Sequence, residues 1–227
     1  MKRYLSAVFA ALLLLSLAGS ALAQEEAHYE GYFLNSAAPS TSSTLSGRGL
    51  VTAIYAPLAS NFVANEYTWV IDGLLLTSGY AVATTNYFTW NVSSSPASFT
   101  IYEDPTQNAR PTFFNCPADL NLGDPRYSDG TVYLKGHFVS FNNQYDSATL
   151  TGTFTGTVNW DSGSPDGFGN LPDGRHGAWT FGSTTSAHFT CIPTLPLYDQ
   201  AMTGRIFQLT TAAGKTSWGK LRRMYGK

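Results

Sequence analysis

Oxygen-bearing side chains gather in one long glycine- and proline-rich stretch, DSGSPDGFGNLPDGRHG, residues 161–177. Asp161, Asp166 and Asp173 are hard oxygen donors of the type that Ca²⁺ prefers, and Asn170 stands among them. Their spacing differs from that of an EF-hand loop, because glycine and proline occupy positions where that loop needs side-chain oxygens. The stretch therefore predicts aspartates that begin turns, with a calcium site as the alternative, and we expect no other cofactor.

Catalytic patterns are absent from the sequence. The four histidines are scattered, and neither a Gly-x-Ser-x-Gly nor a His-Glu-x-x-His motif accompanies any of them. His137 and His188 stand beside phenylalanines, which favours a structural, hydrogen-bonded role, and Asp173 with His176 is a weak pair. The two carboxylates that hydrolyse a glycoside are recognised by their separation in space, which the sequence does not give. A secreted hydrolase acting on a polymer therefore stays open as an alternative. We expect no catalytic residue.

Aromatic residues make up 14% of the chain, and asparagine and threonine flank many of them. Rings edged by amides and hydroxyls hold sugars through stacking and directional hydrogen bonds. The segments EYTW and NYFTWN therefore predict Trp69, Tyr87 and Trp90 as ligand-binding residues. The alternative is that these rings fill a core, as we expect for Trp160.

The two cysteines are Cys116 and Cys191. An even pair in an exported chain predicts a disulfide, which would close a loop of about 75 residues and stabilise the fold by roughly 4 kcal/mol. Free buried thiols are the alternative. Metal binding by two thiols is disfavoured, because structural zinc sites use four ligands.

The apolar pattern that must position these residues has a period of two. Residues 149–160, TLTGTFTGTVNW, place Leu, Gly, Phe, Gly, Val and Trp on one face and threonines with one asparagine on the other. Residues 130–141 form the preceding strand of a hairpin, and NNQYDS is the expected connection. Further strands are predicted at residues 28–34, 48–56, 66–71, 80–90, 97–103, 178–182 and 204–210.

Asp-Gly pairs and other turn residues separate these strands. The pattern leaves open whether Asp72-Gly73 makes a tight hairpin or lies within one long strand. No amphipathic helix is predicted before the C-terminal tail. The expected fold is a single all-β domain, a jelly-roll-like or other antiparallel β-sandwich, with a closed barrel as the alternative.

The N-terminus predicts export. Residues 1–23 have a short basic start, an apolar run and the small-residue exit ALA, as in a cleaved signal peptide. The domain is then expected at residues 24–214, followed by a basic tail at 215–227. No second apolar stretch is long enough to span a bilayer, so we expect a periplasmic, cell-surface or extracellular protein without a transmembrane segment in its mature form.

Charge is divided unevenly along the chain. Residues 24–214 hold all 15 acidic residues and 6 of the 13 lysines and arginines, whereas residues 215–227 hold five basic residues and none that are acidic. An acidic body argues against nucleic acid as a partner, because binding phosphates requires clustered cations.

The tail has an amphipathic pattern when placed on a helix. Its apolar residues share one face and its basic residues surround them. Two interpretations stay open: docking on an anionic envelope surface or a sorting receptor, or packing on the acidic body. The residues assigned to docking are Trp218, Lys220, Leu221, Arg222, Arg223 and Tyr225.

The sequence thus predicts an exported, non-catalytic binding or surface-display protein of the cell envelope or extracellular space. A glycan-binding module, a structural matrix or coat protein and a polymer hydrolase are the alternatives. Neither the ligand nor the oligomeric state follows from the residues.

Overall fold

The computed structural model describes residues 24–35, 43–91, 97–109, 124–146, 148–149, 151–171, 178–187 and 200–208. Antiparallel strands hold most of these residues, and they belong to one compact unit, Glu25–Leu209. The strands are β1 (Gln24–Asn35), β2 (Thr44–Ile54), β3 (Glu66–Val82), β4 (Thr85–Asn91), β5 (Ser98–Asp104), β6 (Thr131–Asp146), β7 (Thr151–Gly163), β8 (Ala178–Ala187) and β9 (Gln200–Gln208). Two short 3₁₀ helices are η1 (Pro125–Tyr127) and η2 (Phe168–Asn170).

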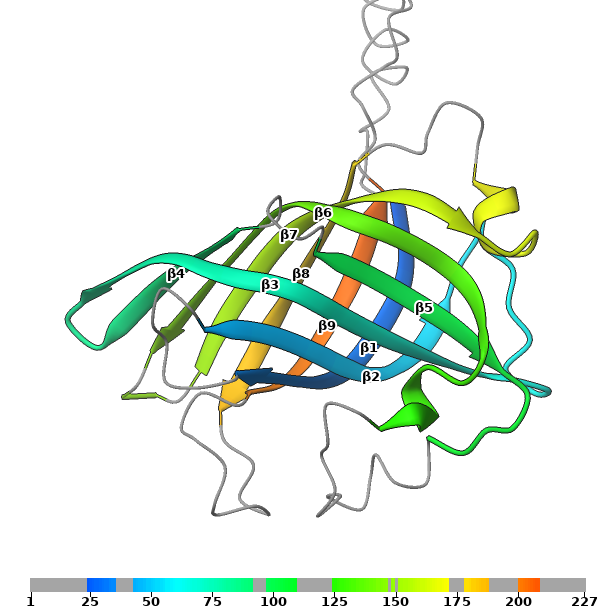
Figure 1. The fold of residues 1–227 in the computed structure, drawn as a ribbon, viewed down its shortest axis with the longest axis horizontal. Coiled ribbons are helices and arrows are strands. Elements are labelled where there is room, and N and C mark those ends of the chain that lie inside the picture. Colours follow the sequence, from blue (N-terminus) through cyan, green and yellow to red (C-terminus); the bar gives the residue numbers. More distant parts are fainter. Residues whose placement is uncertain are drawn as a thin grey trace, which may run out of the picture. The chain divides into compact units, whose positions relative to one another are not determined.

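The strands form one sheet that closes on itself (Figure 1). Its order is β2-β1-β9-β8-β7-β6-β4-β3-β5, and an additional β2–β3 pairing joins its two sides. The predicted all-β class is confirmed. The two stacked sheets of a sandwich are not what these pairings form, because each described strand has a hydrogen-bonded neighbour on both sides. A twisted sheet of about eight strand positions can close in this way around an interior that side chains fill.

β4 and β5 share one strand position, between β3 and β6. Residues Glu66–Asp72 of β3 pair with β5, and Leu75–Val82 pair with β4. β6 is divided in the same way, with residues 131–137 beside β5 and residues 142–146 beside β4. Two short strands therefore complete the sheet where one long strand would otherwise stand.

The open question about Asp72-Gly73 is answered by β3, a single strand of 17 residues. Gly73 lies inside it with a φ of 85°, a conformation that glycine adopts without steric cost. The predicted strand at residues 80–90 was wrong in its extent, because the turn between β3 and β4 falls at Ala83 and Thr84. Neither residue is a typical turn former, so the sequence carries no signal of that turn.

The predicted hairpin of β6 and β7 is confirmed by their pairing from Leu134↔Gly163 to Asp146↔Thr151. β6 is longer than expected, since residues 142–146, assigned to the connection, continue the strand. In β7 the even positions Phe154, Val158 and Trp160 are buried, as the alternation predicts.

Trp69 lies at the centre of the aromatic core. Its side chain is fully buried, and its ring meets those of Tyr29 and Phe99 at centroid distances of 5.5 and 6.1 Å. Phe33 meets the same indole edge-on at 6.3 Å. Edge-to-face contacts of this type are favourable beyond the area that they bury.

Three glycines on β1 and β2 make room for this indole. A Cβ at Gly47 would lie 2.8 Å from the Trp69 ring, and a Cβ at Gly31 or Gly49 would overlap with it. The indole N–H donates to the carbonyl oxygen of Glu30 at 3.0 Å. The ring is therefore held by both shape and a hydrogen bond.

Two loops pack on the core beyond the strands, at residues 55–65 and 164–171. Leu58 and Leu171 are buried within the core cluster. The Tyr133 hydroxyl of β6 lies 2.6 Å from the carbonyl oxygen of Ala59 and 3.2 Å from that of Asp166, so it joins both loops to the sheet.

A smaller hydrophobic cluster lies on the opposite side of β1, β2 and β3. It consists of Tyr32, Leu50 and Val70, which are covered by Ala109 and Tyr127 from the connection between β5 and β6. The outer side of β1, β2 and β3 is therefore partly covered by the segment that connects β5 to β6.

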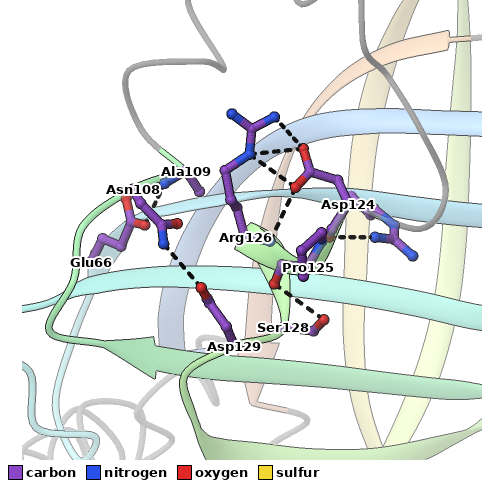
Figure 2. Close-up of polar contacts among 9 residues, drawn as sticks. Glu66, Asn108, Ala109, Asp124, Pro125, Arg126, Ser128 and Asp129 are labelled. Atoms are coloured by element: carbon purple, nitrogen blue, oxygen red, sulfur yellow. Dashed lines mark hydrogen bonds and ion pairs between the residues drawn. The ribbon is translucent and has the colours of Figure 1, made fainter.

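Polar contacts fix the covering segment (Figure 2). Asp124 accepts hydrogen bonds from the Arg126 guanidinium at 2.9 and 3.0 Å, and its carbonyl oxygen accepts one from Arg48 at 2.8 Å. The Arg126 side chain holds the pKa of Asp124 below its ordinary value. Ala109 donates its backbone N–H to the buried Glu66 carboxylate at 2.7 Å.

Several sequence-based predictions concern residues outside the described ranges. The signal peptide at 1–23, the tail at 215–227 and both Cys116 and Cys191 lie outside the described residues, so the disulfide stays a prediction. Within the part of the chain that the structure describes, no helix has the length and apolar character needed to cross a membrane.

We expect Gly31→Ala to destabilise the protein by about 1–3 kcal/mol or more, because the new methyl group meets the Arg48 carbonyl oxygen and the Trp69 ring. Gly169→Ala is the matched control, since its Cβ would have no atom closer than 3.7 Å. Urea unfolding of both variants measures the difference. Equal midpoints for the two would show that the indole does not depend on this close approach.

Candidate functional site

A polar face covers the outer side of the sheet over β4, β6, β7 and β9. In β7 the side chains of Thr151, Thr153 and Thr155 are exposed, while the residues between them point into the core or carry no side chain. We call this surface the threonine face. Its members are Thr85, Tyr87, Asn142, Gln144, Asp146, Thr151, Thr153, Thr155, Thr203 and Arg205.

Strand register aligns these residues in rows. Tyr87 of β4 is the partner of Gln144 in β6, and Gln144 is the partner of Thr153 in β7. The row continues through Thr184 of β8 to Thr203 of β9. Side chains directly opposite each other have Cβ atoms about 4.5–5.5 Å apart. Tyr87, Gln144 and Thr153 therefore present a phenol, an amide and a hydroxyl side by side.

Two hollows lie on this face and share Thr153. The smaller, of about 300 Å³, is lined by Thr85, Tyr87, Gln144, Asp146, Thr149, Thr151, Gly152 and Thr153. The larger and open one, of about 770 Å³, is lined by His28, Tyr29, Glu30, Thr52, Thr153, Phe154, Thr155, Thr203, Gly204 and Arg205.

Gly182 of β8 lies in register between two residues that line the larger hollow. It is the partner of Thr155 on one side and of Arg205 on the other.

Most side chains of the face are neutral hydrogen-bonding groups. The smaller hollow is lined by hydroxyls, a phenol, an amide and one carboxylate, whereas the larger hollow also holds His28, Glu30 and Arg205. Asp146 is the charged residue of the smaller hollow, and the Ala148 backbone N–H, which donates to it at 2.8 Å, lowers its pKa. It is therefore an anionic acceptor at neutral pH. Such a face suits a ligand rich in hydroxyls.

The three predicted ligand-binding residues separate in the structure. Trp69 is fully buried, so a ligand in solvent cannot reach its ring. Tyr87 is half-buried and lines the smaller hollow. The backbone of Trp90 lies in β4 beside Leu76, but its side chain is outside the described residues.

The predicted calcium ligands do not converge among the described residues. Asp161 binds Nδ1 of His137 through its Oδ2 at 2.7 Å. Asp166 contributes its backbone carbonyl oxygen to the loop, where it accepts hydrogen bonds from the Ala59 N–H at 3.1 Å and from the Asn170 side-chain amide at 3.0 Å. Asp173 lies outside the described residues. Where residues are described, no group of three His, Cys, Asp or Glu side chains is arranged to hold a metal ion.

Sequence reasoning missed most of the threonine face. Gln144 and Asp146 belong to residues assigned to a connection, so their alignment with β7 was not foreseen. The exposed threonines of β7 were recognised as the polar side of a strand, but a single strand gives no information about its neighbours. The alternation in TxTxT was the available signal.

Glu26 is an unusual titratable group near the larger hollow. It lies on β1 two residues before His28, its side chain is fully buried, and neither carboxylate oxygen has a hydrogen-bond partner among the described residues. Burial without a partner disfavours the charged form and raises the pKa of Glu26 to about 8. The carboxyl group is therefore mostly protonated at neutral pH.

Comparison with known proteins gives no relative: no protein-family model matches the chain, and neither a curated protein nor a solved structure is significantly similar to it. The function must therefore be argued from the residues themselves.

We expect Glu26→Gln to flatten the pH dependence of stability. In the native protein Glu26 keeps its proton up to about pH 8, whereas the unfolded chain releases it near the ordinary glutamate pKa of 4.5. The native state thus binds the extra proton between these values, so stability falls as pH rises through that window. Urea unfolding at about pH 5 and about pH 8 measures this slope. A slope identical in the two proteins would contradict the buried, protonated state.

Proposed function

We propose that the protein is an exported binding protein that holds a neutral glycan on its threonine face. The carrying observation is the row Tyr87, Gln144 and Thr153, which borders a hollow of about 300 Å³. An aromatic ring beside an amide and several hydroxyls offers the two interactions that a sugar uses, stacking on its apolar face and hydrogen bonds to its hydroxyls.

The position of the site on strands supports this function. Tyr87, Gln144 and Thr153 stand on β4, β6 and β7, which are paired along their length. Groups on paired strands keep their mutual spacing better than groups on loops. The threonine face extends past the smaller hollow to Thr203 and Arg205, so a chain of several sugar units finds contacts along it.

Export is inferred from the leader-like sequence of residues 1–23. The tail at 215–227 would add contact with an anionic envelope surface, since its five basic residues follow an acidic body. Assembly as a matrix or coat protein through sheet edges is less favoured, because the described strands are all paired on both sides.

Tyr87→Ala is expected to weaken glycan binding by roughly two- to tenfold, which corresponds to the loss of one aromatic contact of about 0.5–1.5 kcal/mol. The measurement is affinity electrophoresis of the mature protein in gels that contain soluble β-glucan, xylan, mannan or dextran. Retardation by one of these polymers identifies the probe for titration.

Tyr55→Ala is the matched control. Tyr55 is 42% exposed and does not line the smaller hollow; its ring meets that of His28, which lines the larger one, at a centroid distance of 5.4 Å. Its removal leaves the contacts at Tyr87, Gln144 and Thr153 in place, so retardation should be unchanged. Equal losses in the two variants, or no retardation of the wild-type protein by any of the four polymers, would overturn the proposal.

A further inference from the structure

A serine, a histidine and an aspartate lie side by side on three neighbouring strands, outside both hollows. Ser98 of β5 and His137 of β6 are direct cross-strand partners. Asp161 of β7 binds His137 on the other side, with 2.7 Å between its Oδ2 and Nδ1 of the imidazole. Ser98 alternates with buried residues and is half-buried, so it faces outward as His137 does.

The atom that Asp161 contacts decides the state of the imidazole. A carboxylate at Nδ1 favours the tautomer with its proton on that nitrogen and leaves the Nε2 lone pair available as a base. Nε2 has no hydrogen bond to any residue in the described ranges. The order carboxylate, imidazole and hydroxyl is the one that activates a serine in acyl transfer.

A cation completes the group. Lys135 stands on β6 two residues before His137 and is the partner of Thr100, the next outward residue of β5 after Ser98. It is exposed and forms no ion pair among the described residues. A flexible ammonium at this diagonal position, about 7–8 Å away between Cα atoms, can reach an oxyanion that forms at Ser98.

The surroundings of the pair hold one further carboxylate. Asp72 of β3 is the partner of Ser98 on the side opposite His137, and it interacts with Ser46 and Arg48. Asn159 of β7 is the direct partner of His137. Lys135 is therefore the cation on β6 that offsets the two aspartates next to the serine and the histidine.

We propose that Ser98 is an acyl-accepting nucleophile, with His137 as its general base, Asp161 as a positioning residue and Lys135 as the group that binds the carbonyl oxygen of an ester. The Ser98 oxygen attacks the ester carbonyl carbon while its proton moves to Nε2 of His137. The bond to the alcohol then breaks, and the leaving oxygen takes that proton. A water molecule, deprotonated by the same Nε2, then attacks the acyl carbon; the bond to Ser98 breaks, the Ser98 oxygen takes the proton back from Nε2, and the carboxylic acid leaves.

A purely stabilising role explains less of this arrangement. The side chains of His137 and Asp161 are 44% and 50% exposed, and exposed ion pairs contribute little to stability. The Ser98 hydroxyl is not hydrogen-bonded to Nε2 at rest. Such contacts are often formed only when substrate is bound, and rotation of serine χ1 between staggered positions can form this one.

The test uses the mature protein, a fluorophosphonate that labels activated serines, and p-nitrophenyl acetate as the ester. We expect labelling and saturable release of p-nitrophenolate, both lost in Ser98→Ala and retained in Ser140→Ala, a control serine on β6 that is the partner of Thr157. The rate should fall about 100-fold in Ser98→Ala. Glycan retardation should be unaffected, because the two sites do not share a residue.

Asp161→Asn tests the positioning role. Removing the carboxylate takes away the partner that holds the imidazole in its tautomer and orientation, so kcat for p-nitrophenyl acetate should fall while KM stays unchanged. Thermal unfolding within a few degrees of wild type confirms that each variant is folded. Equal labelling of Ser98→Ala and wild type, no labelling of either, or an unchanged kcat in a folded Asp161→Asn would overturn the proposal.

Discussion

The packing of one indole against three glycines is the constraint on which the closed sheet depends. Gly31 of β1 and Gly49 of β2 are cross-strand partners, and Gly49 is the partner of Trp69 in β3. Because the two glycines carry no side chains, the Trp69 ring lies over the backbone of the neighbouring strand β2 and of β1 beyond it. The hydrogen bond to Glu30 then fixes its direction. A large rigid ring thus joins three strands at the place where the sheet must bend.

The same alternation that builds this core also builds the outer face. β6 and β7 send aromatic residues such as Phe141 and Phe154 inward and hydroxyls or amides outward, so the interior is filled and the exterior carries hydrogen-bonding groups. The stacked pair Phe141 and Phe154, with ring centroids 5.6 Å apart, lies beneath the strands that present Gln144 and Thr153. A rigid interior therefore supports a surface whose polar groups hold fixed spacings.

The sequence predicts the local features of this fold better than the non-local ones. The period of two in residues 149–160 predicts the inward side of β7 correctly, because that side depends only on the residues of one strand. The same period places Trp69 inward with Tyr67 and Ile71, since Glu66, Thr68 and Asp72 occupy the other side of that strand. The assignment of Trp69 to ligand binding overlooked this pattern, because aromatic residues flanked by polar ones occur both in cores and in binding sites.

The closure of the sheet and the two hollows of the threonine face depend on pairings between strands that are distant in the sequence. Nothing in β4 or β5 alone indicates that they occupy one position between β3 and β6. The contact between His137 and Asp161 depends on the register of β6 and β7, with shifts at two places along that pair. Such irregularities change which outward residues meet, and a pattern within one strand does not contain them.

The pairing of β1 with β9 has a consequence for the way this chain folds. These strands stand near the two ends of the described chain, yet they are adjacent in the sheet. Synthesis proceeds from the N-terminus, so β1 must wait with one unpaired edge until nearly all of the other strands have appeared. Hairpins such as β6 and β7 form early, because their residues are close in the sequence. The pairing of β1 with β9 joins residues that are far apart in the sequence and forms slowly. The most vulnerable species for wrong pairing between molecules is therefore a nearly complete chain that lacks β9.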